Sequence, residues 1–253
     1  MSKLPKAHKF IDLSDYGRPA ARIISQALKD TRFTPIHVTI AFIISGLFGV
    51  ISMLLGNYWL AGFFLILKSI LDAADGELAR IKKTPSYTGR YLDSVADIIL
   101  NAIIFLALWH ITDSNIWYTA LAFFGIQLQG TLYNYYYVIL RNQFNGDTTS
   151  RIFEDTTPIA LEGEKQKNVN ILFSLYKMFY GGFDKAIYFL DPDAPKGKVL
   201  PKWLMTAIST FGLGFQLLII SIMLVSGLKH NIIPFFIGYS AMIFIFIAIR
   251  KML

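Results

Sequence analysis

The sequence predicts an all-α integral membrane protein, and three observations support this class. Of the 253 residues, 54% are hydrophobic and only 16% are charged, whereas about a quarter of the residues of a soluble domain are charged. Several stretches contain roughly 20 apolar residues, which at about 1.5 Å per residue can cross a hydrocarbon core of about 30 Å. The chain has no cysteine, which excludes disulfides, a thiolate nucleophile and a cysteine metal site.

We expect six transmembrane helices in a single domain that covers residues 1–253. The apolar segments run approximately from Pro35 to Gly56, Trp59 to Leu78, Val95 to Ile111, Trp117 to Leu140, Trp203 to Gly227 and Ile232 to Ile249. The third segment is short for a span. Its helix is therefore expected to begin earlier, near Thr88, and to carry Asp93 and Asp97 into the membrane.

The 24 Lys and Arg residues set the predicted orientation. Seven precede the first span, four lie from Arg80 to Arg90 and nine from Arg141 to Lys202, whereas the connections around Asn57 and Asp113 have none. The positive-inside rule then places both termini and the basic loops in the cytoplasm. The net charge of +7 thus belongs to loops beside a membrane, and we expect no nucleic-acid partner.

The cytoplasmic N-terminal segment, residues 1–34, is expected to contain an amphipathic helix. From Tyr16 to Asp30, apolar and basic side chains alternate with helical spacing: Ala20, Ile23, Ile24 and Leu28 against Arg18, Arg22 and Lys29. This pattern fits an interfacial helix on the cytoplasmic membrane surface. It fits a solvated helix packed on the bundle equally well.

A cytoplasmic loop is expected at about residues 141–202. Its stretch from Ile171 to Leu190 is apolar and aromatic, but charged and glycine residues interrupt it, and a seventh span would place basic residues outside. We therefore expect two interfacial half-helices there, with aromatic side chains at headgroup depth.

The segment from Leu71 to Asp97 carries five of the 17 acidic residues beside or within the spans, where ionisable groups are costly unless they pair, face a cavity or bind a cation. At about 100° per residue, Asp72 and Asp75 share one helical face with Gly76 and Ala79. The next helix repeats the arrangement, with a four-residue spacing through Gly89, Asp93 and Asp97.

Two antiparallel helices can therefore present four carboxylates to one cavity. A site that has only oxygen ligands, with no His or Cys, suits Mg²⁺ or Mn²⁺. Four carboxylates are enough for a site with two metal ions. The alternative is a solvated run of charges at helix ends. We prefer that alternative for Glu77, Lys82, Lys83 and Arg90, but not for the four aspartates, because they are face-aligned and lie where the helices enter the membrane.

These residues resemble a known signature. The chain reads Asp72-x-x-Asp75-Gly76-x-x-Ala79-Arg80, eight residues, Gly89-x-x-x-Asp93-x-x-x-Asp97, which is similar at every position to the signature of the CDP-alcohol phosphotransferases. The resemblance implies an integral membrane enzyme of lipid synthesis, usually a homodimer. Such an enzyme moves a substituted phosphoryl group from a CDP-linked alcohol to an acceptor hydroxyl and releases CMP.

The resemblance also implies roles for individual residues. Asp72, Asp75 and Asp93 would bind metal, and Asp97 would be either the general base on the acceptor hydroxyl or a further ligand. The residues expected around the cytidine nucleotide, with Arg80 on a phosphate, are Thr39, Asp72, Asp75, Gly76, Ala79, Arg80 and Gly89. Lys68 lies one turn before Asp72, so it could balance the charge of the site or touch an acceptor phosphate.

The chain departs from the family at one position. Many relatives carry Thr-Pro-Asn-x-x-Thr at the start of the first span, whereas this chain has Ile36 where those relatives have Asn. Any contact of that Asn with the nucleotide is lost here or made by His37. Further along, Gln127, Thr131 and Asn134 share a face of the fourth span, where they could bond between helices or line an acceptor pocket.

Two other functions compete with the transferase. An intramembrane prenyltransferase also uses aspartates and Mg²⁺, but typically has two separated motifs and more spans. A divalent-cation transporter would distribute its carboxylates through the membrane depth, whereas these lie towards the cytoplasmic ends of two helices. For the transferase, CDP-diacylglycerol is the expected donor, with glycerol phosphate, inositol, its phosphate, serine or another polyol as acceptor. The reverse arrangement, a soluble CDP-alcohol and a lipid acceptor, stays open.

Overall fold

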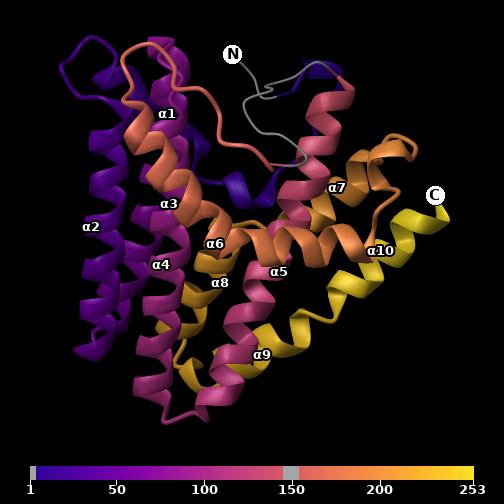
Figure 1. The fold of residues 1–253 in the computed structure, drawn as a ribbon. Helices are drawn as coiled ribbons and strands as arrows, with labels where there is room; N and C mark the ends of the chain where they lie inside the picture. The colour runs from indigo at the N-terminus through magenta and orange to yellow at the C-terminus, as the bar shows by residue number, and fades with distance from the viewer. Residues whose placement is uncertain (1–3, 145–153) are drawn as a thin grey trace.

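The computed structural model describes residues 4–144 and 154–253, and over these ranges every regular element is helical (Figure 1). Five helices precede the C-terminal third: α1 (Arg18–Leu28), α2 (Pro35–Leu54), α3 (Tyr58–Lys82), α4 (Tyr87–Thr112) and α5 (Ile116–Gln143). The others are α6 (Gln166–Leu190), α7 (Lys202–Ile208), α8 (Leu213–Val225), α9 (Ile232–Tyr239) and α10 (Met242–Met252). The all-α prediction is confirmed.

Helix α2 packs against both α3 and α4, and tight turns join the three helices (Figure 1). Lys83 ends α3 in a left-handed conformation, with φ of 55°. Ser86 then begins α4, because its hydroxyl accepts the backbone N–H of Gly89, as N-cap residues do. This turn makes α3 and α4 antiparallel, and the expected start of the third span near Thr88 agrees with the start of α4 at Tyr87.

Three helical segments are long and apolar enough to cross a membrane: Pro35–Leu54, Tyr87–Thr112 and Lys229–Met252. The pair Lys202–Phe211 and Leu213–Val225, bent by 55°, makes a fourth if it is one span. Helices α3 and α5 do not belong to this set, since α3 carries ionisable groups and α5 several amide side chains. The protein is thus an α-helical membrane protein with three or four spans assigned by composition, rather than the six expected.

The N-terminal segment packs into the bend between α7 and α8. The N–H of Leu13 donates to the Ser209 hydroxyl over 2.9 Å, and Ser14 lies so close to Gly212 and Gly214 that neither position has room for a side chain. Asp12 accepts the Tyr133 hydroxyl of α5 over 2.5 Å. These contacts tie the first residues to the centre of the bundle.

Helix α1 packs on α3 rather than standing apart from the bundle. Ala21 and Ser25 are fully buried, and the Ser25 hydroxyl donates to the Ala74 carbonyl over 2.9 Å. Ile23, on the other side, is 72% exposed. One face of the expected amphipathic helix is therefore covered by protein, and contact of the other face with a membrane stays a prediction.

The prediction of two half-helices between Ile171 and Leu190 was wrong. Helix α6 is continuous from Gln166 to Leu190, and Gly181 and Gly182 do not break it. Each glycine costs about 1 kcal/mol of helix propensity, but buried side chains such as Phe173 and Ile187 pack α6 against α4 and α5. Figure 1 shows α6 crossing the bundle obliquely. Of the expected loop at about 141–202, residues 145–153 lie outside the described ranges.

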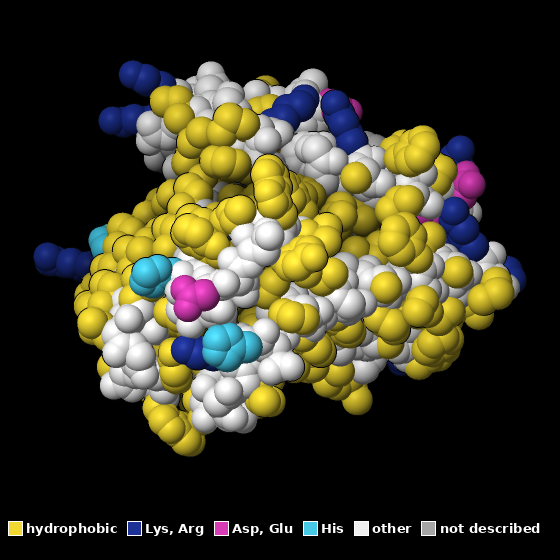
Figure 2. All heavy atoms as spheres, turned by 90° about the horizontal axis from the view of Figure 1, so that it is seen from below, with side chains coloured by type: hydrophobic (Ala, Val, Ile, Leu, Met, Phe, Trp, Pro, Cys, Tyr) yellow, Lys and Arg dark blue, Asp and Glu magenta, His cyan; other side chains and the backbone are white. Residues whose placement is uncertain are grey.

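Figure 2 shows the lower end of the molecule, where hydrophobic side chains cover most of the surface and charged ones are sparse. Which end of the bundle faces the cytoplasm stays a prediction.

Candidate active site

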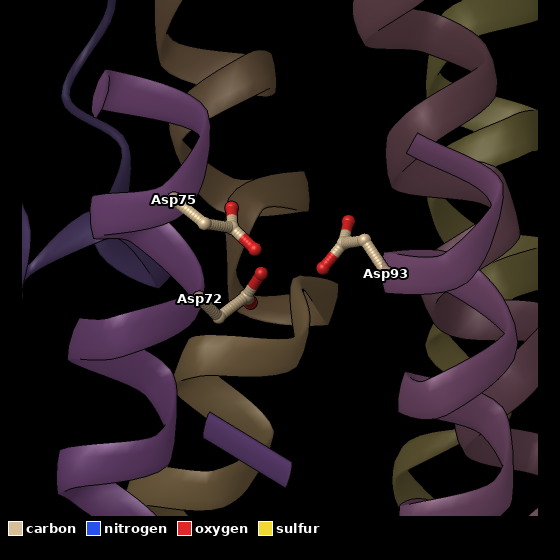
Figure 3. Close-up of side chains that lie close together, drawn as sticks. All are labelled: Asp72, Asp75 and Asp93. Atoms are coloured by element: carbon tan, nitrogen blue, oxygen red, sulfur yellow. The ribbon is translucent and has the colours of Figure 1, made fainter. Parts of the chain in front are cut away.

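Three carboxylates from the two halves of the motif converge between α3 and α4. Asp72 and Asp75 project from α3 and Asp93 faces them from α4 (Figure 3). One carboxylate oxygen from each lies within 4.8 Å of the other two. The antiparallel turn at Lys83–Ser86 therefore brings together residues that are 18 to 21 positions apart in the sequence.

Few groups neutralise this acidic group. Asp75 is 7% exposed and accepts the Thr39 hydroxyl over 2.7 Å. Oδ1 of Asp93 is buried and has no hydrogen-bond partner among the described residues. Clustered, partly buried carboxylates repel one another unless a proton or a cation neutralises them. Three hard oxygen ligands with an unsatisfied buried acceptor fit a divalent cation such as Mg²⁺ or Mn²⁺.

Asp97 is near these three carboxylates but is not one of the group. It forms an ion pair with the ammonium group of Lys68, which is completely buried and 4.9 Å from the centre of the Phe42 ring. An ammonium group loses its hydration when buried, so it requires such a partner. Of the two roles expected for Lys68, this geometry favours charge balance.

The start of α2 lies beside the motif. A Cβ on Gly89 would be 4.0 Å from Cγ1 of Ile36, so the side chain that replaces the family's Asn faces this glycine. Nδ1 of His37 accepts the backbone N–H of Thr34 over 3.2 Å as part of a capping box. That nitrogen of His37 is therefore occupied in starting α2, while Thr39 reaches the carboxylates directly.

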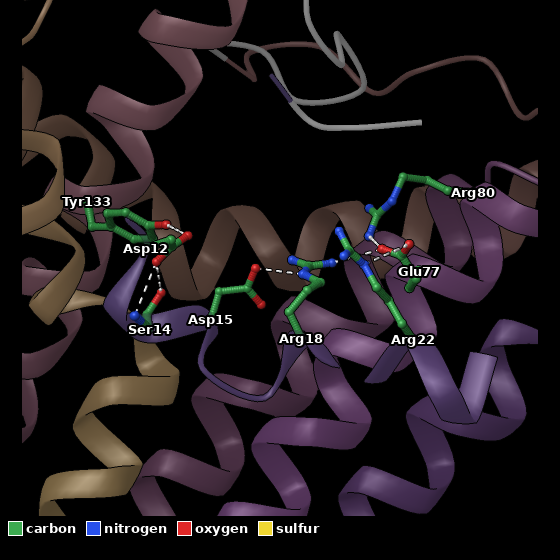
Figure 4. A network of polar contacts seen from close by, with 8 residues as sticks. All are labelled: Asp12, Ser14, Asp15, Arg18, Arg22, Glu77, Arg80 and Tyr133. Atoms are coloured by element: carbon green, nitrogen blue, oxygen red, sulfur yellow. Dashed lines mark hydrogen bonds and ion pairs between the residues drawn. The ribbon is translucent and has the colours of Figure 1, made fainter. Parts of the chain in front are cut away.

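Arg80 points to Glu77 instead of the three aspartates. Its Nη2 donates to Glu77 over 2.9 Å, Arg18 of α1 donates to the same oxygen over 3.1 Å, and Arg22 lies 3.9 Å from the other oxygen (Figure 4). Arg18 also pairs with Asp15 over 2.6 Å. Our interpretation of Glu77 as a solvated helix-end residue was therefore wrong: it joins α1 to α3.

The small residues of the motif keep the surface near Arg80 open. A Cβ on Gly76 would meet only the Arg80 guanidinium, at 3.6 Å. The Ala79 carbonyl accepts the N–H of Thr84 over 3.0 Å, which places Ala79 at the last turn of α3.

Residues 32–176 match the CDP-alcohol phosphatidyltransferase family. The chain belongs to the CDP-alcohol phosphatidyltransferase family. The matched residues contain both halves of the motif, so the resemblance found in the sequence is confirmed.

A curated relative is the "Bifunctional IPC transferase and DIPP synthase" of Thermococcus kodakarensis, which is 37% identical over 89 residues. The match covers 34% of this chain and 20% of the relative. The chain thus spans about one fifth of the length of this relative.

In this CDP-alcohol phosphatidyltransferase, the segment before α6 holds the start of α4. The Glu164 carboxylate accepts the Ser86 hydroxyl and the backbone N–H of Thr88, each over 2.7 Å, and the N–H of Tyr87 over 3.2 Å. Burial opposes ionisation, but these hydrogen bonds outweigh it and hold the pKa of Glu164 below its usual value. A carboxylate at a helix N-terminus is also stabilised by the helix dipole.

Glu154 makes a second attachment one turn further on. It pairs with Arg90 and accepts the Tyr91 hydroxyl over 2.7 Å. Arg90 is thus an ion-paired residue, and our interpretation of it as a solvated helix end was wrong. Sequence reasoning missed Glu154 and Glu164, because the partners of both lie more than 60 positions away and the polar segment that contains the two glutamates has no periodicity.

Proposed function

We propose that this protein transfers a phosphatidyl or phosphoalcohol group from a CDP-linked donor, with CDP-diacylglycerol as the donor, to the hydroxyl of an acceptor alcohol. This proposal is supported by the chain's membership of the family and by its similarity to a relative that is named as a transferase and synthase. The observation that carries it is the group formed by Asp72, Asp75 and Asp93, with Asp97 beside it.

Asp72, Asp75 and Asp93 would hold Mg²⁺ or Mn²⁺, and we propose two ions. When bound, such cations neutralise the negative charge of a pyrophosphate and of the leaving phosphate. The unsatisfied Oδ1 of Asp93 supports this assignment, because a buried acceptor without a partner costs about 1–3 kcal/mol.

We assign Asp97 as the general base. It would take the proton of the acceptor hydroxyl as that oxygen attacks the phosphorus next to the donor's alcohol. The new oxygen–phosphorus bond forms as the pyrophosphate bond breaks, and CMP leaves. Lys68 would hold the carboxylate of Asp97 in place, because a buried ammonium group fixes its partner more firmly than solvent does.

The nucleotide would lie against Gly76, Ala79 and Gly89, which lack bulky side chains, with Thr39 at its edge. Arg80 would bind a phosphate of the donor. An Arg side chain has five N–H donors, so the bond to Glu77 leaves others for this contact. Ile36 would make an apolar contact where relatives have an amide.

For the membrane arrangement, we propose six crossings: α2, α3, α4, α5, the bent pair of α7 and α8, and the pair of α9 and α10. Helix α3 packs against α2 and α8, and its charged residues Lys68, Asp72 and Asp75 lie at the proposed site. Both termini and the active site would then face the cytoplasm, with α1 at the membrane surface. We also propose a homodimer.

The test is CMP release by the purified protein with CDP-diacylglycerol and Mg²⁺ or Mn²⁺, across a panel of acceptor alcohols. We expect acceptor-dependent release that Asp93→Asn and Asp97→Asn abolish, whereas Asp113→Asn, in the turn between α4 and α5, retains it. The proposal would be overturned if folded protein released no CMP with any acceptor, and also none with soluble CDP-alcohols and lipid acceptors. Cation flux without CMP release would instead support the transporter.

A further inference from the structure

A polar pocket of about 100 Å³ lies between α4, α5 and α6, and residues 154–155 form part of its wall. Three cationic and three acidic residues line it, together with two other polar residues: Arg90, Lys177, Lys185, Glu154, Asp155, Asp184, Thr131 and Asn134. Because liquid water occupies about 30 Å³ per molecule, the pocket has room for roughly three waters, or for one small molecule with a few heavy atoms.

The pocket lies next to the candidate active site on the same face of α4. Arg90 precedes Asp97 by seven residues, which is about two turns of a helix and about 10 Å along its axis. On the α6 side, the hydroxyl of Tyr180 donates to the Ser94 carbonyl over 3.1 Å. Burial, followed by the charges of Asp97 and Asp93, raises the pKa of Tyr180 well above its usual value. Gly181, the next residue, lines the pocket.

Equal numbers of basic and acidic residues line the pocket, but not all of them form ion pairs. Arg90 is paired with Glu154, and the Lys177 ammonium donates to the Asp155 backbone carbonyl over 3.0 Å. No ion pair among the described residues includes Asp184. Burial, followed by the charge of Glu154, raises the pKa of Asp184 to about 6. Asp184 has a hydrogen bond with Tyr176, and Lys185, which also lines the pocket, is exposed. The pocket therefore offers a carboxylate that is hydrogen-bonded but, among the described residues, not ion-paired.

A second, independent feature is an unsatisfied hydroxyl. Oγ1 of Thr131 is buried and has no hydrogen-bond partner among the described residues, and the residue is only 7% exposed. Thr131 lines the same pocket. A buried polar atom without a partner is costly, so this atom indicates that a polar ligand completes the wall.

We propose that this pocket binds the acceptor alcohol and that the acceptor is a small molecule carrying an amino group beside its hydroxyl. Its ammonium group would pair with Asp184, and its polar atoms would bond to Thr131 and Asn134. Of the cations on the wall, Arg90 pairs with Glu154, Lys177 donates to the Asp155 carbonyl and Lys185 is exposed. A phosphorylated acceptor would therefore have to break these contacts or draw Lys185 inward, and a neutral polyol would leave Asp184 without a cation. Protonation also removes the nitrogen lone pair, so transfer occurs to oxygen.

This inference rests on the proposed function, and the experiment separates the two. CMP release is measured with the intact protein and CDP-diacylglycerol, using the matched acceptors 2-aminoethanol and ethane-1,2-diol, with glycerol, inositol and glycerol phosphate alongside. We expect kcat/KM to be at least about tenfold higher for 2-aminoethanol than for the diol. Asp184→Asn should raise the KM for the amino alcohol about tenfold and leave the KM for the donor unchanged.

The control is Asp193→Asn, which removes an exposed carboxylate beyond the end of α6 and should leave both KM values unchanged. If Asp184→Asn does not fold, Thr131→Val should raise the acceptor KM in the same direction. Equal use of the diol, preference for glycerol phosphate, or an unchanged acceptor KM in the folded variants would overturn the inference while the transferase stands. Absence of CMP release with every acceptor would overturn both.

Discussion

Two acidic regions lie on helix α3, about one turn apart, and they differ in how their charges are compensated. Around Glu77, three arginines, Arg18, Arg22 and Arg80, surround one carboxylate. Between α3 and α4, three carboxylates share a space in which Oδ1 of Asp93 has no partner among the described residues. The ion pairs around Glu77 join helices. Among the three aspartates, only the Thr39 hydroxyl and the nearby charge of Lys68 offset the cost of desolvation, and this incomplete compensation indicates a binding site.

Replacing one of the three aspartates should affect activity most. Asp93→Asn should lower kcat about a thousandfold or more, since one ligand and one charge are lost where a metal ion would bind. Without divalent cations, the variant should melt at a higher temperature than the unmodified protein, because repulsion among the carboxylates decreases. Kinetics of CMP release and thermal unfolding in detergent measure both effects.

The control for Asp93→Asn is the addition of Mg²⁺ or Mn²⁺. It should raise the melting temperature of the unmodified protein and have little effect on the variant, because a ligand stabilises only the state that binds it. If the metal-free variant melts at a lower temperature than the metal-free unmodified protein, Asp93 stabilises the fold. That result would contradict the proposed difference between the two acidic regions.

Removal of the buried ammonium group should have the next largest effect. Lys68→Met should destabilise the protein by about 3–5 kcal/mol, because Asp97 would be left as a buried charge without its partner. The double variant Lys68→Met, Asp97→Asn should recover most of this stability but no activity. Chemical denaturation of the single and double variants checks this. If the double variant is no more stable than Lys68→Met, the ion pair does not account for the loss.

In the compensated region, a substitution should affect stability more than chemistry. Glu77→Gln should lower the free energy of unfolding by about 1–2 kcal/mol, since three guanidinium groups lose their anion but stay partly solvated. Loss of activity per folded molecule should be far smaller than for Asp93→Asn. Parallel unfolding and CMP-release measurements on the two variants test the contrast, and equal losses of activity would contradict it.

The smallest expected effect is a pH dependence at the start of α4. The folded-state pKa of Glu164 is below its usual value of 4.5, so the folded state favours the carboxylate. Its contribution is complete above the unfolded pKa and is lost as the pH falls through the folded pKa. We expect the ionised Glu164 side chain to contribute about 0.5–1 kcal/mol to the free energy of unfolding. The free energy of unfolding should change less between pH 7 and a pH below 4 in Glu164→Gln than in the unmodified protein. The variant Glu162→Gln, at an exposed position, should behave like the unmodified protein.

The membrane class, the antiparallel motif helices and the four aspartates could be predicted from the sequence, because each depends on local spacing. Apolar runs about 20 residues long predict spans, and carboxylates three or four positions apart share a helix face. Only three residues separate α3 from Ser86, and so short a connection favours antiparallel helices. Family membership followed from the same residues.

The partners of the charged residues could not be predicted. Glu77 and Arg90 had the pattern of solvated helix ends, and only contacts with α1 and with Glu154 show them to be joined to other elements. Helix α6 is continuous because α4 and α5 bury one side of it, which outweighs the local cost of its two glycines. The ion pair of Asp97 with Lys68 likewise joins residues of two different helices.

The sequence by itself thus determined the chemical groups, their helical faces and the membrane environment, because these depend on residues within a few turns of one another. Tertiary structure alone decided which charges are compensated and which are left for a ligand. That choice depends on contacts between residues from 29 to more than 60 positions apart, and the energy of a buried charge is set by whichever group the fold places next to it.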